Sequence, residues 1–126
     1  MRKPISPTVH GVMDYLSVPL LLLAPQVFGF AGKGAQITST AAGVVLAYSA
    51  VTAYRLGIVK MISFRVHGAI DLVLGIAFIA AHFFAAHSVL GLDNVGTARN
   101  FFALYGFALV LVVSLTDFSE SAHHGT

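Results

Sequence analysis

Two His and two Asp residues of this chain occur in a spacing that is used twice. His10 and Asp14 are four residues apart, and His67 and Asp71 repeat that spacing 57 residues further along. A separation of four places two side chains on one face of a helix. Imidazole and carboxylate groups can bind a metal ion, exchange protons near neutral pH or bond to one another. These four residues are therefore the candidate site.

The repeat is longer than the His/Asp pairs. Segment 3–14 reads KPISPTVHGVMD and segment 60–71 reads KMISFRVHGAID, so Lys, Ile, Ser, Val, His, Gly and Asp keep their places. A repeat of this kind indicates one structural unit used twice. The units that we predict are repeat 1 over about 3–57 and repeat 2 over about 60–120.

The composition identifies the environment of the site. Hydrophobic residues make up 57% of the chain and charged residues 10%, against about 25% charged residues in soluble domains. This indicates an integral membrane protein in a lipid bilayer, with residues 1–126 forming a single membrane domain. Its Lys and Arg residues are scattered between apolar runs, which argues against nucleic-acid binding. The chain has no Cys, which excludes disulfides and thiolate chemistry.

Four apolar segments must position the site, at about 9–30, 38–54, 64–89 and 98–115. Each is close to the ~20 residues that cross a bilayer as a helix. We therefore predict an all-α fold, a bundle of four transmembrane helices built from two tandem helical hairpins. The first and third spans would run in the same direction, which relates the hairpins by a pseudo-twofold axis along the membrane normal.

Local signals predict where the helices begin. Ser6 and Ser63 occupy N-cap positions and Pro7 suits a first helical turn. Glycines punctuate the two outer loops, namely Gly32, Gly34, Gly91 and Gly96.

Basic residues predict the orientation. Five of them fall on the side of the termini and the middle loop (Arg2, Lys3, Arg55, Lys60 and Arg65), against Lys33 and Arg99 on the other. The positive-inside rule then places both termini in the cytoplasm, and the inner membrane of a bacterium is the membrane that we expect.

Segments of the chain resemble the SPW-repeat family of small bacterial integral membrane proteins. Val9-His10 with Asp14 is similar to the helix start of that repeat, and 24–30 (APQVFGF) is similar to its Ser-Pro-Trp-Leu-Phe-Gly-Phe ending. The link 48–57 (YSAVTAYRLG) also resembles the family's connection between repeats. Ala24 and Gln26 stand where the family name has Ser and Trp. The resemblance implies a two-repeat membrane fold and carries no activity or mechanism with it.

The expected location of the four polar residues leaves three interpretations open. An ionised Asp facing lipid is costly, so we expect His10, Asp14, His67 and Asp71 to form one buried cluster near the cytoplasmic face. In the first interpretation the cluster is structural and fixes the register of the helices. In the second it holds a cofactor, either a divalent metal bound by all four residues or haem b bound by His10 and His67 as its two axial ligands. In the third it relays protons. Arg55 is a further candidate for the cluster. No aromatic box or second ring of polar ligands is evident in the sequence, so no cofactor is favoured.

The remaining His residues are weaker candidates. His82 and His87 are five apart, which places them on different helix faces, and His123 and His124 lie in a polar tail. The function that we expect is therefore that of a non-enzymatic structural or accessory membrane subunit, as a homo-oligomer or within a larger membrane complex. The alternatives are a haem- or metal-binding membrane redox protein and, third, a proton-linked small transporter acting as an oligomer.

Overall fold

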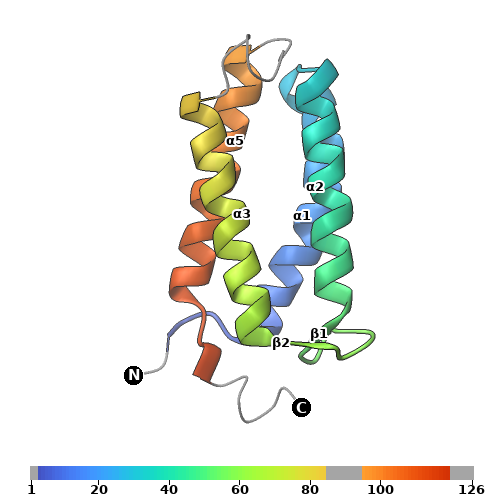
Figure 1. The fold of residues 1–126 in the computed structure, drawn as a ribbon, viewed down its shortest axis with the longest axis vertical. Helices are drawn as coiled ribbons and strands as arrows, with labels where there is room; N and C mark the ends of the chain where they lie inside the picture. The colour runs from blue at the N-terminus through green and yellow to red at the C-terminus, as the bar shows by residue number, and fades with distance from the viewer. Residues whose placement is uncertain (1–2, 85–94, 120–126) are drawn as a thin grey trace.

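The protein is an all-helical bundle. The computed structural model describes residues 3–84 and 95–119, and four long helices account for most of them: α1 (Pro7–Phe28), α2 (Gly32–Ala50), α3 (Phe64–Phe84) and α5 (Val95–Leu115). Figure 1 shows the helices side by side, with α1 next to α2 and α3 next to α5. We call the end of the bundle that carries the N-terminal segment and the connection between α2 and α3 the base.

Two helices begin where the sequence predicts. Ser6 is the N-cap of α1, its Oγ accepts a hydrogen bond from the backbone N–H of Val9, and Pro7 opens the first turn. Ser63 accepts the same kind of bond from the N–H of Val66 at the start of α3. Both predicted caps are confirmed, and they start the two helices that carry the His/Asp pairs.

The prediction for the second apolar segment was wrong in its bounds. We expected 38–54 with Gly32 and Gly34 in a loop, whereas α2 covers Gly32–Ala50. Gly34 is buried in the helix, where an added Cβ would lie 3.1 Å from the Phe30 ring and 3.2 Å from Ala98. This glycine therefore serves close packing, and the sequence pattern of a turn residue was misleading.

Short parallel strands close the base. β1 (Thr52–Ala53), which begins two residues after the last residue of α2, pairs with β2 (Ile62–Ser63), directly before α3. A similar bridge joins Ile5, before α1, to Thr116, after α5. These pairings tie the start of each His-bearing helix to the end of another helix, and they bring Thr52 and Thr116 next to the site.

The distribution of polar and apolar side chains is compatible with a protein that spans a membrane. Large apolar side chains face outward along every helix, among them Leu16, Val27, Val44, Val73 and Leu104. Most of the buried polar side chains lie near the base, namely His10, Asp14, Thr52, His67, Asp71 and Thr116. Within the described residues three helices are long and apolar enough to cross a membrane, at Pro7–Phe28, Phe64–Phe83 and Thr97–Leu115. The chain is thus suited to a membrane.

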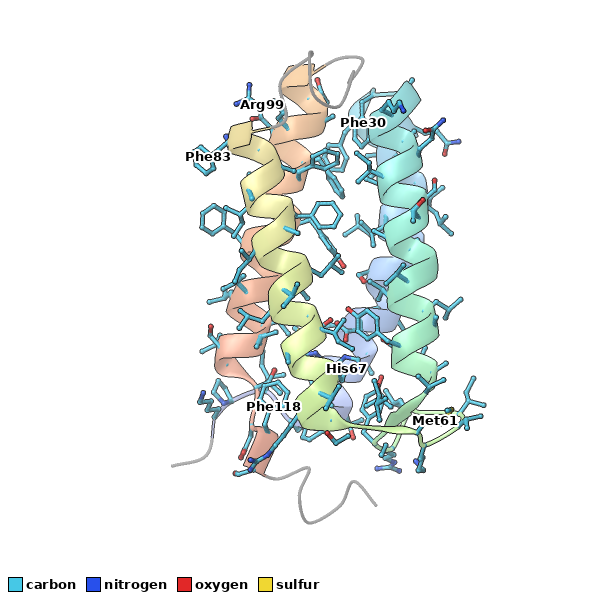
Figure 2. The ribbon with its side chains drawn as sticks, in the orientation of Figure 1. Phe30, Met61, His67, Phe83, Arg99 and Phe118 are labelled. Carbon is cyan, nitrogen blue, oxygen red and sulfur yellow. The ribbon has the colours of Figure 1, made fainter. Side chains whose placement is uncertain are left out.

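Packing away from the base is aromatic and close. Phe30, Phe78 and Phe102 are buried together, and Phe30 lies at the end of the bundle opposite the base (Figure 2). Helices α3 and α5 touch at Gly75 and Gly106, where a Cβ on Gly106 would lie 2.6 Å from the Gly75 carbonyl oxygen. This contact fixes the separation of the two helices above the site.

Candidate functional site

The four side chains that the repeat singled out meet inside the base. His10 and Asp14 come from α1 and His67 and Asp71 from α3, and one potential ligand atom of each lies within 4.8 Å of the others. Asp14 is 3% exposed and the other three are fully buried. Figure 2 shows the His67 side chain in the interior between the helices. We call these four residues the His/Asp cluster.

The shorter contacts in the cluster join different helices. His10 Nε2 lies 2.6 Å from Asp71 Oδ2, and His67 Nε2 lies 2.5 Å from Asp14 Oδ2. Within each helix, the same nitrogen and the Asp one turn away are 3.2 Å apart. Each His therefore bonds to the Asp of the other helix, and the cluster links α1 to α3.

Two threonines hold the far side of the imidazole rings. Nδ1 of His67 is 2.8 Å from Thr52 Oγ1, and Nδ1 of His10 is 2.7 Å from Thr116 Oγ1. Thr52 Oγ1 donates its own proton to the Tyr48 carbonyl at 2.5 Å, and Thr116 Oγ1 donates to the Val112 carbonyl at 2.5 Å. A hydroxyl has one proton, so each Thr can only accept from its His. Both rings thus carry a proton on Nδ1 and direct Nε2 into the cluster.

This arrangement determines how many protons the cluster holds. An Nε2 to Oδ2 hydrogen bond needs one proton, on either the imidazole or the carboxyl group. The two short bonds between the helices, His10 to Asp71 and His67 to Asp14, therefore hold two protons. With two protons present the four side chains have no net charge, which suits their burial in an apolar bundle.

The two carboxylates have different surroundings. The Tyr48 hydroxyl donates to Asp71 Oδ1. Asp14 instead borders a groove of about 270 Å³ between α1 and α5, which Ser17 and Tyr105 also line. The Tyr105 hydroxyl donates to Ser17 Oγ at 3.3 Å, and Ser17 Oγ donates to the Asp14 carbonyl at 2.7 Å. Asp14 is thus the edge of the cluster closest to the outside.

Aromatic rings enclose the cluster from the base. Phe64 packs against both histidines, with ring centroids 5.2 Å from His10 and 5.5 Å from His67. Tyr54 lies 5.6 Å from His67, and Phe118 lies 6.0 Å from His10. Burial raises the pKa of the Tyr54 hydroxyl, so this group stays protonated.

The glycine after each histidine makes room for one of these rings. An added Cβ on Gly11 would lie 2.3 Å from Cε2 of Tyr54, and one on Gly68 would lie 2.4 Å from Cε1 of Phe118. The repeated His-Gly pair therefore supplies an imidazole together with space for an aromatic ring beside it.

Arg55, the further candidate for the cluster, does not pair with its carboxylates. It is exposed in the connection between α2 and α3, and the ion pairs of both carboxylates within the described chain are with His10 and His67. His82 lies near the opposite end of α3, where its Nδ1 is 3.0 Å from the Arg99 carbonyl. His87, His123 and His124 lie outside the described residues.

The cluster geometry fits a small ion better than a haem. A bis-imidazole haem needs the porphyrin to pass between two Nε2 atoms. Here carboxylate oxygens at 2.5 to 3.2 Å from both Nε2 atoms fill that space, and the two imidazole centroids are only 5.3 Å apart. The residues therefore do not fit the haem alternative, whereas two nitrogens and two oxygens form a donor set suited to Zn²⁺ or a similar ion.

Sequence reasoning missed the shell around the cluster, where neither an aromatic box nor a second ring of polar groups was expected. A signal for it was present, because Val51-Thr52-Ala53-Tyr54 is faintly repeated as Leu115-Thr116-Asp117-Phe118. The same position in each segment supplies the Thr, and the position two further on supplies the aromatic ring. Tyr48 has no such counterpart. Thr116 follows Thr52 by 64 residues, and the residue that follows Tyr48 by the same 64 residues is Val112.

Comparison with known proteins adds no family to this description. No family model matches the chain, and no curated protein or solved structure matches it either.

Proposed function

We propose that the protein is a four-span integral membrane protein in which the His/Asp cluster joins two helical hairpins, acting as a non-enzymatic structural or accessory subunit. The observation that carries this proposal is the pair of bonds between α1 and α3, His10 to Asp71 and His67 to Asp14. All four side chains are buried and bonded to one another, which favours a structural role over contact with a substrate. In lipid, where no hydrophobic force holds helices together, hydrogen bonds between helices contribute to their association alongside close packing.

The fourth span in this proposal is α2. It has 19 residues, which corresponds to about 28 Å of helix at 1.5 Å per residue. It runs beside α1 along most of its length (Figure 1). Its polar residues include Thr38 and Ser49, which are buried, while Val44 and Leu46 face outward. A helix packed in this way on a spanning neighbour would cross the bilayer with it.

Reciprocal contacts support the proposal of two structural repeats about a pseudo-twofold axis. Thr52, after α2, bonds to His67, and Thr116, after α5, bonds to His10. Tyr54 and Phe118 then pack on Gly11 and Gly68, each in its own repeat. The resemblance to SPW-repeat proteins fits this arrangement and stays a prediction.

The proposed location is a bacterial inner membrane with the base in the cytoplasm. Lys3, Arg55, Lys60 and Arg65 lie at the base and are exposed, against Lys33 and Arg99 near the opposite end. Outward apolar faces would contact lipid, further copies of the chain or a larger membrane complex. The proton-linked transporter remains the third hypothesis, because it needs a path beyond the cluster.

A double-mutant cycle between His10 and Asp71 tests the structural role. Either His10→Leu or Asp71→Leu leaves a partner buried without its bond, whereas the double variant retains the complete His67 to Asp14 pair. We expect a coupling of about 0.5–3 kcal/mol in the free energy of unfolding, measured in mild detergent with a chelator present. The matched double variant His10→Leu/Asp14→Leu leaves only the 3.2 Å pair on α3 and should be less stable. Additive single effects would show that the cluster does not couple the hairpins.

A further inference from the structure

We propose that the His/Asp cluster is a binding site for one divalent transition-metal ion of the Zn²⁺ type, which enters in exchange for two protons. The donor atoms are Nε2 of His10 and His67 and one carboxylate oxygen each of Asp14 and Asp71, all within 4.8 Å of one another. This inference uses the same residues as the proposed structural role and does not depend on that role.

Four of the six spacings between donor atoms are close to those around a tetrahedral ion, and the other two, His10 to His67 and Asp14 to Asp71, are within 4.8 Å. Zn²⁺ bonds to nitrogen and oxygen ligands at about 2.0–2.2 Å, which puts neighbouring ligand atoms roughly 3.3 Å apart. The two contacts within each helix are already 3.2 Å, while the two between helices are 2.5 and 2.6 Å. An ion would therefore replace the two protons of the short bonds, widen those two contacts by under an ångström and draw the donor pairs that lie up to 4.8 Å apart closer together.

The imidazole rings are already oriented for a metal. Thr52 and Thr116 accept from Nδ1–H of His67 and His10, which leaves the Nε2 lone pair of each neutral ring pointing into the cluster. A hydrogen bond to the second ring nitrogen is the usual way in which proteins orient a metal-binding His. The Tyr48 hydroxyl similarly holds the Oδ1 atom of Asp71.

Charge favours a divalent ion. Two carboxylates are balanced either by two protons or by one M²⁺, so the exchange of M²⁺ for 2 H⁺ leaves the buried cluster neutral. Two imidazole nitrogens select against Ca²⁺ and Mg²⁺, which prefer oxygen ligands. Asp14 is the one member of the cluster that is not fully buried, and it borders the groove between α1 and α5 that Ser17 and Tyr105 line.

The experiment needs a chain whose other histidines cannot bind metal. We would replace His82, His87, His123 and His124 by Ala, purify this background in mild detergent, strip it with a chelator and titrate it with ZnCl₂ and CoCl₂. We expect one Zn²⁺ per chain, a tetrahedral Co²⁺ absorption spectrum and release of two protons per ion, measured by calorimetry in buffers of different ionisation enthalpy. In this background His10→Ala and His67→Ala should each abolish the Co²⁺ spectrum.

Milder variants keep the test valid if those substitutions unfold the protein. Thr52→Val and Thr116→Val retain all four ligands, so they should keep the stoichiometry and weaken affinity about 10–100-fold. Thr40→Val, at an exposed position of α2, should leave affinity unchanged. Absence of stoichiometric binding in the background chain, or equal binding by folded His67→Ala protein, would overturn the site. The double-mutant cycle between His10 and Asp71 is measured without metal. The structural role and the metal site can therefore each be refuted without the other.

Discussion

A single hydroxyl on each side of the His/Asp cluster determines how the histidines are protonated. The hydroxyl groups of Thr52 and Thr116 donate their own protons to backbone carbonyls, so each can only accept a hydrogen bond from the Nδ1–H of its histidine. Without them each ring could turn or change tautomer, and Nε2 would no longer have a defined role. These threonines are therefore as important to the site as the four residues with obvious chemistry.

Removal of one threonine hydroxyl should destabilise the protein. Thr52→Val keeps the shape but leaves the buried Nδ1–H of His67 without an acceptor, which costs about 1–3 kcal/mol. Thr52→Ser retains the oxygen and should recover most of that loss. The measurement is the free energy of unfolding in detergent, with Thr40→Val as a control that should change it little. Equal stability of Thr52→Val and Thr40→Val protein would contradict the proton assignment.

At the scale of single residues, the sequence predicted the four residues of the His/Asp cluster better than it predicted the residues that surround them. His10, Asp14, His67 and Asp71 could be found because the repeat preserves both residue type and spacing. Thr52 and Thr116 belong to a fainter repeat, and hydroxyl residues in apolar helices bond most often to their own backbone. Their second bond, to a ring from another helix, depends on the strand pairings at the base, and spacing along the chain does not contain that information.

Helices that contribute to the His/Asp cluster carry apolar side chains on the outer face and polar side chains on the inner face. Helix α3 carries His67 and Asp71 on its inner face and Val73 and Ile76 on its outer face. It approaches α5 through Gly75 and Gly106, where backbone touches backbone. The sequence predicted the presence of these helices well, but it placed α2 too late because Gly34 reads as a turn residue until its neighbours Phe30 and Ala98 are known.

Filling the contact between α3 and α5 should separate the helices. Gly106→Ala would put a methyl group 2.6 Å from the Gly75 carbonyl oxygen, and overpacking of this kind typically costs about 1–3 kcal/mol. The matched control is Gly43→Ala on α2, where an added Cβ meets nothing within 4 Å, and it should be neutral or slightly stabilising. Thermal unfolding in detergent compares the two. A Gly106→Ala protein as stable as Gly43→Ala would mean that the two helices do not touch here.

The whole molecule places most of its buried polar groups at one end of an apolar bundle. The base carries both the cluster and most of the described basic residues, so the positive-inside rule would place the cluster near the cytoplasmic face. Composition was enough to predict a membrane protein. The proposed crossing of α2 rests on its packing against α1, since this helix is not among the three that length and apolar character alone select.

Cysteine labelling decides between three and four spans. The chain has no Cys, so single substitutions at Lys3, Ala31, Ile58 and Ser119, all exposed, report the side of the membrane without a background signal. Four spans with the base in the cytoplasm predict that an impermeant maleimide labels only Ala31→Cys in intact cells. The other three positions should react after permeabilisation.

Each alternative topology gives a different labelling pattern. If α2 did not cross, Ala31→Cys and Ile58→Cys would react on the same side, and Lys3→Cys and Ser119→Cys on opposite sides. The four-span proposal would then fail, and with it the pseudo-twofold, since the two hairpins could not be equivalent. Labelling of Lys3→Cys, Ile58→Cys and Ser119→Cys in intact cells, with Ala31→Cys protected, would instead keep the four spans and place the His/Asp cluster at the outer face.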